Sequence, residues 1–219
     1  MYKIEELLDL SHTIAAPLFE GKEYPWEVLD DIKSFILSLG PSLPVDEFEQ
    51  VSEGIWIARD ALIFPSAYIG GPCIIDHGAE VRHCAFIRGS AIVGKNCVVG
   101  NSVELKNVVL FDNVQTPHYN YVGDSILGYK SHMGAGSITS NVKGDKSLVT
   151  VRMGEEKMET GLKKMGAMLG DFAEIGCNSV LNPGTIVGVN AQVYPLSSVR
   201  GTVPARHIWK RDGEVVAKR

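Results

Sequence analysis

No stretch of the chain approaches the roughly eighteen consecutive apolar residues of a membrane-spanning helix. The first ten residues, MYKIEELLDL, are acidic and amphipathic and lack the pattern of a secretory signal peptide. Only four cysteines occur in 219 residues, and no two are spaced as a CxxC pair. A disulfide framework and a cysteine-based zinc site are therefore not expected. These absences predict no membrane partner, no bound metal and a cytoplasmic location.

Positive charge is also scarce, because the whole chain has a net charge of −5. Residues 1–53 contain twelve Asp or Glu and three Lys, a net charge of −9, so residues 54–219 carry +4. No basic stripe interleaved with aromatic residues is present, and a nucleic-acid partner is therefore not expected. The later part of the chain suits an anionic small molecule better than the acidic first part does.

What the chain does contain is a period of six. Nine aliphatic residues recur at this spacing without a miss: Ile57, Ile63, Ile69, Ile75, Val81, Ile87, Val93, Val99 and Leu105. A small residue follows most of them four positions later, where a larger side chain would overpack a tight corner. So short a period indicates a hexapeptide-repeat solenoid, since ordinary strands and helices have periods of 2 or 3.6. We predict an all-β solenoid in which three hexapeptides form one triangular coil.

The period is interrupted twice. Leu105 and Leu127 are 22 residues apart, which is one eighteen-residue coil plus four. This spacing predicts a loop of four extra residues near 111–121. A second and longer insertion is expected at 142–164, before the step resumes at Leu169. Functional residues often lie on loops held by a regular scaffold, and His118 lies within the first of these.

Residues 1–48 are expected to form a separate helical segment. Pro25 to Leu39 has apolar residues at helical spacing, and Gly40 stands just past its end. We expect this segment to cap the first coil, because a terminal coil otherwise exposes a strand edge. A partner-binding role is the alternative. The predicted organisation is a helical cap at 1–48, a β-helix at 49–203 and a C-terminal tail at 204–219.

Four stretches carry a family resemblance: VELKN, PHYNYVGDS, GAGSITSN and GLKKMGAMLGD. Over about residues 51–207 the chain resembles the C-terminal acetyltransferase domain of bifunctional glucosamine-1-phosphate acetyltransferase/N-acetylglucosamine-1-phosphate uridyltransferase and its archaeal sugar-phosphate relatives. The resemblance implies a left-handed parallel β-helix, a homotrimer with active sites between subunits, and acetyl-CoA as co-substrate in UDP-N-acetylglucosamine biosynthesis. Residues 1–50 hold no Gly-rich nucleotide loop, so uridyltransferase or pyrophosphorylase activity is not expected.

The resemblance assigns His118 as the general base, because a neutral imidazole can accept the proton that an amine loses on attacking a thioester. It also implies a set of residues for an amino-sugar 1-phosphate: Arg88, Lys106, Tyr121, His132, Asn141 and Lys146. The cations among them suit a phosphate, and Glu104 is expected to hold Arg88 or Lys106 in place. Tyr121 and Asn141 are expected to bind sugar hydroxyls.

For acetyl-CoA the resemblance implies Ala135, Cys177 and Arg206, with backbone amides near Gly134 holding the pantetheine arm and the oxyanion. Three positions depart from the family pattern. His132 stands where Asn is usual, Val142 replaces Tyr, and Cys177 replaces Ser. These departures leave the identity of the sugar open.

Two other interpretations remain open on the same scaffold. A γ-type carbonic anhydrase would bind zinc through two His five apart plus a third, whereas His77 and His83 are six apart. The second is a non-catalytic protein that binds a sugar phosphate or a nucleotide sugar in a regulatory role. The substitutions at His132 and Val142 favour that possibility.

Overall fold

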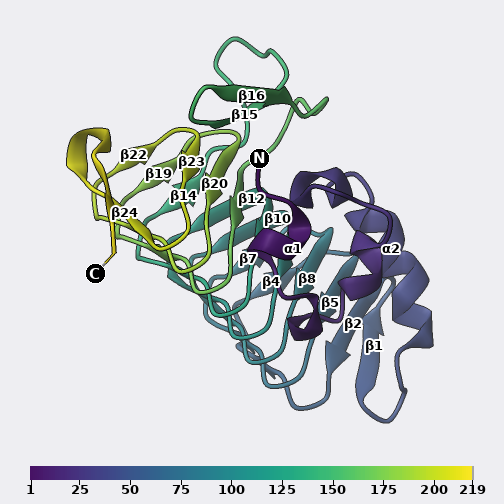
Figure 1. The fold of residues 1–219 in the computed structure, drawn as a ribbon. Coiled ribbons are helices and arrows are strands. Elements are labelled where there is room, and N and C mark those ends of the chain that lie inside the picture. Colours follow the sequence, from purple (N-terminus) through teal and green to yellow (C-terminus); the bar gives the residue numbers. More distant parts are fainter. Residues whose placement is uncertain (219) are drawn as a thin grey trace.

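The computed structural model describes residues 1–218 as a β-solenoid whose strands stack in parallel on three walls (Figure 1). Wall I contains β2 (Ile55–Ala58), β5 (Cys73–Ile75), β8 (Ala91–Val93), β17 (Ala167–Leu169), β20 (Thr185–Val187) and β23 (Thr202–Val203). Wall II contains β3 (Leu62–Ile63), β6 (Glu80–Val81), β9 (Val98–Asn101), β11 (Gln115–His118), β13 (His132–Met133), β18 (Glu174–Ile175), β21 (Gln192–Val193) and β24 (His207–Trp209). Wall III contains β4 (Tyr68–Ile69), β7 (Phe86–Ile87), β14 (Ile138–Thr139), β19 (Val180–Leu181) and β22 (Ser198–Val199). The predicted all-β solenoid is confirmed.

The hexapeptide period stacks its aliphatic residues inside the coils. Ile57 pairs with Ile75, and Ile75 pairs with Val93, one coil apart on wall I. The small residues fill the corners, and Cys73 and Cys97 are both fully buried. Burial raises the pKa of the Cys73 thiol to about 12, so this side chain behaves as an apolar filler and not as a reactive group.

Two long strands, β10 (Glu104–Leu110) and β12 (Tyr121–Leu127), run without a break from wall III into wall I. Leu105 pairs with Val122, and Leu110 pairs with Leu127, so these coils contain 17 residues. The predicted four-residue loop near 111–121 is therefore wrong. The 22 residues from Leu105 to Leu127 make up four units of the hexapeptide repeat. Two of these units, at the corner between walls III and I, contain five residues instead of six.

The second predicted interruption is a true insertion. Leu127 pairs with Leu169, 42 residues later, so the chain leaves the solenoid after β14 and returns at β17. Between them it forms an antiparallel hairpin of β15 (Thr150–Met153) and β16 (Glu156–Glu159). Figure 1 shows this hairpin standing out beside the later coils.

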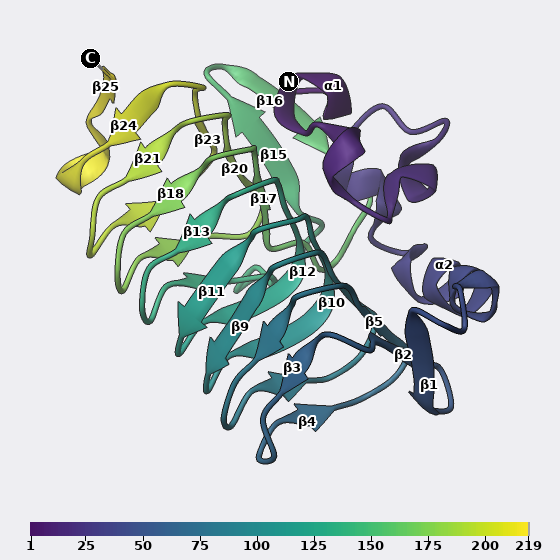
Figure 2. The same cartoon turned by 90° about the horizontal axis from the view of Figure 1, so that it is seen from below.

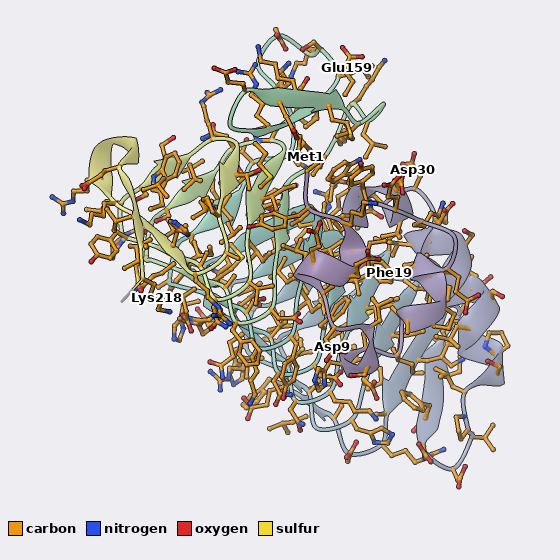
Figure 3. All side chains as sticks on the ribbon, viewed as in Figure 1. Met1, Asp9, Phe19, Asp30, Glu159 and Lys218 are labelled. Carbon is orange, nitrogen blue, oxygen red and sulfur yellow. The ribbon has the colours of Figure 1, made fainter. Side chains whose placement is uncertain are left out.

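The N-terminal segment consists of short helices: α1 (Ile4–Leu7), η1 (Leu10–His12), η2 (Ala16–Phe19), η3 (Pro25–Val28), α2 (Ile32–Leu39) and η4 (Gly40–Ser42). It runs along the side of the solenoid and not across the end of the first coil, as Figure 2 shows. The Tyr2 hydroxyl accepts a hydrogen bond from the Ala205 amide, while Gly40 lies against the Trp56 ring. Between these ends lies Phe19, labelled in Figure 3. Its ring packs edge-on against Phe111.

The reason for this placement is on the outer face of wall I. In seven coils of wall I the residue before the inward aliphatic residue is itself large and apolar, and all seven are buried: Trp56, Ile74, Ile92, Val109, Ile126, Met168 and Ile186. In the last coil this position holds Thr202. On wall III the corresponding residues include Tyr68 and Phe86, which are 60% and 43% exposed. Wall I therefore needs a covering layer along its whole length, and the N-terminal segment provides it.

The remaining strands close the two ends of the solenoid. β1 (Phe48–Ser52) pairs antiparallel with β2 at the first coil, and β25 (Val215–Ala217) pairs antiparallel with β24 at the last, after η5 (Arg211–Gly213). Within residues 1–218, no helix has both the length and the apolar character required to cross a membrane.

The covering layer gives a stability prediction on two adjacent residues of α2. Ile36 is fully buried, whereas Leu37 is 46% exposed. Ile36→Ala is expected to lower the free energy of unfolding by about 2–4 kcal/mol through a cavity under the layer, and Leu37→Ala by less than about 1 kcal/mol. Urea denaturation of both variants measures the difference. Equal losses would contradict the proposed role of α2 as a cover for wall I.

Candidate functional site

The corner between walls III and I holds a compact polar cluster around Asp124, whose side chain is nearly buried. Its carboxylate accepts hydrogen bonds from Lys106 Nζ at 2.8 Å, Asn107 Nδ2 at 3.0 Å and Asn141 Nδ2 at 2.5 Å. A buried carboxylate is costly unless it is paired and hydrogen-bonded. These three donors therefore fix Asp124, and Asp124 in turn fixes the positions of Lys106 and Asn141.

The shortened coils create this cluster. Asn107 and Asp124 each turn the corner with a positive φ, +55° and +48°, a conformation that Asn and Asp tolerate better than most side chains. The insertion begins and ends at the same place. The Met165 amide donates to the Asn141 carbonyl, and the Gly166 amide donates to the Asp124 carbonyl. The corner thus anchors both ends of the hairpin-bearing segment.

Tyr121 and Arg88 lie next to this cluster on wall III. The Tyr121 hydroxyl accepts a hydrogen bond from Asn141 Nδ2 at 3.1 Å, which leaves its own proton to donate. Burial, and then the nearby Asp124 carboxylate, raises the pKa of the Tyr121 phenol, so it stays protonated at neutral pH. The Arg88 guanidinium pairs with Glu104 at 2.9 Å, which is one of the two pairings expected for Glu104.

His118 lies at the other end of wall III, at its corner with wall II. Its side chain is exposed, and its amide donates to Asn120 Oδ1 at 3.2 Å. Asn120 is almost fully buried, and its amide group donates to the carbonyls of Gly134 and Ser137 at 2.8 and 3.1 Å. Asn120 therefore ties the backbone of His118 to the turn at Gly134–Ser137.

The residues expected to contact acetyl-CoA are only partly brought together. The Gly136 amide donates to the His118 carbonyl, and the Asn178 amide donates to the Ala135 carbonyl, so Ala135 and Cys177 stack above His118 at one corner. Arg206 instead lies at the corner between walls I and II, where its amide donates to the Val189 carbonyl. The structure does not gather Arg206 with the other two.

Two expected substrate residues also lie apart from the Asp124 cluster. His132 points outward from wall II, where Nδ1 is 2.9 Å from Glu174 Oε2. Lys146 is an exposed residue on the insertion with a φ of +60°. His118 and Asp124 themselves have five residues of mostly extended chain between them, roughly 15 Å at the rise of a β-strand. One copy of the chain therefore presents two polar groups at opposite corners of wall III.

The two histidines considered as zinc ligands lie at different corners of the solenoid. His77 lies at the corner between walls I and II, between Asp60 and Glu47, whereas His83 lies at the corner between walls II and III and bonds Ser66. In the part of the chain that the structure describes, no three His, Cys, Asp or Glu side chains are grouped so as to hold a metal ion.

Sequence reasoning missed Asn107, Asn120 and Asp124. Asp124 was visible in the matched run PHYNYVGDS, but its partners Lys106 and Asn141 are 18 and 17 residues away. A repeat of eighteen already stacks Asp124 on Lys106, whereas the pairing with Asn141 needs the 17-residue register of these coils. Asn120 stands two residues after His118, and a polar residue inside so regular an apolar pattern was the available signal.

Parts of the chain are similar in sequence to known proteins. Residues 69–156 match the family model of the GMPPB C-terminal domain. The chain is 30% identical over 192 residues to a bifunctional sugar-1-phosphate nucleotidylyltransferase/acetyltransferase of Sulfurisphaera tokodaii, covering 85% of this chain and 47% of that protein. It is 29% identical over 115 residues to the bifunctional protein GlmU of Methanocaldococcus jannaschii, covering 52% and 28%. The chain spans less than half the length of these curated relatives.

Among solved structures, a hexapeptide transferase family protein of Anaplasma phagocytophilum superposes with a TM-score of 0.42 at 16% identity, covering 74% of this chain and 78% of that one. The chain is a hexapeptide-repeat β-solenoid. Within that class it resembles the C-terminal acetyltransferase domain of the bifunctional sugar-1-phosphate enzymes, and the resemblance predicted from its motifs is confirmed.

The contrast between the two acid–cation pairs yields a prediction. Asp124→Asn replaces a buried acceptor with a group that presents hydrogens to three donors, and it should cost about 2–3 kcal/mol of unfolding free energy. Glu104→Gln makes the same chemical change in the more exposed pair with Arg88, and it should cost less than about 1 kcal/mol. Thermal and urea unfolding compare the two. A Glu104 variant as unstable as the Asp124 variant would show that the buried cluster has no special structural role.

Proposed function

We propose that the chain is an acetyl-CoA-dependent N-acetyltransferase that acts on an amino-sugar 1-phosphate of the glucosamine-1-phosphate type, with His118 as the general base. The observation that carries the proposal is the pairing of an exposed His118 with the Gly134–Ser137 turn through buried Asn120. The sequence match to sugar-1-phosphate nucleotidylyltransferase/acetyltransferases supports the reaction class. No uridyltransferase activity is proposed for this chain.

The reaction follows from the chemistry of these groups. The sugar amine attacks the thioester carbonyl and forms the C–N bond of a tetrahedral intermediate, which then collapses to the amide as the C–S bond breaks. The neutral His118 imidazole takes the proton from the amine and returns it to the departing CoA thiolate. A backbone amide near Gly134 or Cys177 stabilises the oxyanion of the tetrahedral intermediate. Ala135 and Cys177 line the path of the pantetheine arm, and Arg206 is proposed to contact the CoA phosphates.

The sugar is proposed to lie near the Asp124 cluster. Asn141, held by Asp124, and the protonated Tyr121 hydroxyl can hydrogen-bond its hydroxyl groups. Arg88, Lys106, His132 and Lys146 complete the proposed substrate set. These residues all lie within residues 69–156, the part of the chain that matches the family model of the GMPPB C-terminal domain.

A homotrimer accompanies this proposal. His118 and the Asp124 cluster are roughly 15 Å apart along wall III, farther than one amino sugar reaches. Tyr68 and Phe86, whose rings are 5.5 Å apart, form an exposed aromatic surface on the same wall. Contact between wall III of one copy and a corner of another would bring the two groups together and cover these rings.

The role of His118 is tested against a histidine in the same corner column. His83 lies two coils earlier, where it bonds Ser66. His118→Ala should lower the rate of acetyl transfer by about 10²–10⁴-fold while leaving the melting temperature unchanged. His83→Ala should leave the rate within about threefold. Release of CoA thiol, with the N-acetylated product identified by mass, measures both.

Near wild-type turnover by the His118 variant would refute its assignment as the base. A wild-type chain that binds the amino-sugar phosphate but never releases CoA thiol would instead favour the non-catalytic, sugar-phosphate-binding function.

A further inference from the structure

Asp76 is a charged residue in a position that the other coils fill with small or apolar residues. It stacks between Ala58 and Gly94 at the corner of walls I and II. In the later coils the same position holds Phe111, Gly128, Gly170, Gly188 and Pro204. The Asp76 side chain is fully buried, and neither the hexapeptide repeat nor the proposed reaction requires an acid there.

One carboxylate oxygen of Asp76 has no hydrogen-bond partner. Its Oδ1 accepts a hydrogen bond from the His77 amide at 2.7 Å, whereas Oδ2 is buried and unpaired. The His77 ring does not supply a partner, because its two nitrogens are 2.9 Å from Asp60 Oδ1 and 3.1 Å from Glu47 Oε2. A buried carboxylate is costly unless its oxygens are paired. Oδ2 therefore needs a partner that the chain does not provide.

Asp112 places a second carboxylate beside the first. Its Oδ1 accepts a hydrogen bond from the Lys95 amide at 2.9 Å, one coil beyond the His77 amide that bonds Asp76. Neighbouring coils are about 4.8 Å apart, so the two carboxylates are separated by roughly that distance. Burial, and then repulsion by Asp76, raises the pKa of Asp112, which shows that the two charges interact. Two acids this close favour a positive charge between them.

Asp171 shows how the chain satisfies a carboxylate at this corner without a ligand. It occupies the position of Asp112 two coils later, and its two oxygens accept hydrogen bonds from the Tyr129 amide and the Asp9 amide, both at 2.8 Å. Asp112 also contacts the N-terminal segment, because its own amide donates to the His12 carbonyl at 2.9 Å. Among residues 1–218, however, no donor reaches its second oxygen.

A pocket of about 230 Å³ lies where the two carboxylates meet the N-terminal segment. Its lining includes Asp76 and Asp112 from the corner and the hydroxyl-bearing Ser11 and Thr13 from the segment. Lys95 also lines it, but within residues 1–218 its ammonium takes part in no ion pair. The pocket is smaller than the sites of about 300–1,000 Å³ that bind drug-sized ligands, yet it has room for an ion and several waters.

We propose that this pocket binds one divalent cation through oxygen, Mg²⁺ or Ca²⁺, between Asp76 and Asp112. Two carboxylates roughly 4.8 Å apart match two opposite metal–oxygen bonds of about 2.4 Å. The Ser11 and Thr13 hydroxyl oxygens and water complete the coordination, since Mg²⁺ in particular keeps several waters and needs only one or two carboxylates. The cation ties the N-terminal segment to the coils beneath it.

Calorimetric titration and thermal unfolding of the full chain test the site, after metal is removed with EDTA. MgCl₂ and CaCl₂ are added separately, and NaCl at equal ionic strength controls for screening. The wild type should bind one equivalent of at least one of the two ions, and its melting temperature should rise by about 3 °C or more.

Three variants locate the ion. Asp76→Asn and Asp112→Asn each remove one negative charge from the site, so each should weaken the affinity by about tenfold or more. Asp171→Asn is the matched control: it loses a hydrogen bond at the same corner and is less stable, but it should bind the ion as the wild type does. Asp112 is only partly buried, so its variant keeps the test decisive if Asp76→Asn does not fold.

Lys95→Gln separates a bound ion from an internal partner. If the ion binds between the two aspartates, removing the nearby ammonium should strengthen its binding severalfold. If the Lys95 ammonium is itself the partner of Asp76, the variant should melt at a lower temperature in EDTA and gain no affinity, which would overturn the proposal.

Two further results would overturn it. The first is a wild-type chain that binds neither ion at millimolar concentration, and a higher melting temperature for Asp76→Asn in EDTA would then assign a proton to the buried acid. The second is equal ion affinity in the wild type and in both aspartate variants, which would place the bound ion elsewhere on the chain. Neither result depends on whether the chain transfers an acetyl group.

Discussion

The parallel pairing of each coil with the next is the constraint on which the rest of the structure depends. It places residues 17 or 18 positions apart directly above one another, so Leu105 stacks on Val122 and Ile57 on Ile75. Backbone hydrogen bonds and buried aliphatic side chains fix this register together, because a slip of one residue would turn every inward side chain outward. The same register decides which corner side chains lie next to one another. It is this register that brings Asp124 to Lys106 and Asn141.

The three walls of the solenoid differ in what covers them. Wall I carries a continuous outer layer of apolar side chains and is closed by the N-terminal segment from Tyr2 to Gly40. Walls II and III are not covered by that segment. The polar groups suited to binding and proton transfer are at the two ends of wall III, near His118 and near Asp124. The acidic N-terminal segment therefore acts as a structural cover, and it reaches the corner of walls III and I, where the Leu29 carbonyl accepts a hydrogen bond from Asn107 Nδ2.

The period of six predicted the solenoid because the inward positions must be aliphatic whatever else the coil carries. The same counting failed between Leu105 and Leu127, since two shortened turns with positive φ at Asn107 and Asp124 give the same total as one loop of four residues. The side cover of wall I was predictable from the seven large residues that precede the inward ones. The contact of the insertion with the last coil, where Thr202 Oγ1 donates to the Arg152 carbonyl, was not predictable, because it depends on how a 42-residue interval folds back.

The central claim is that this chain transfers an acetyl group to a phosphorylated amino sugar. The most direct measurement is release of CoA thiol from acetyl-CoA by the wild-type chain, with glucosamine-1-phosphate and galactosamine-1-phosphate as acceptors. The account predicts thiol release matched one to one by N-acetylated sugar phosphate with at least one of them, and much slower release with the unphosphorylated sugars. Acetyl-CoA left intact with both phosphorylated acceptors would contradict it.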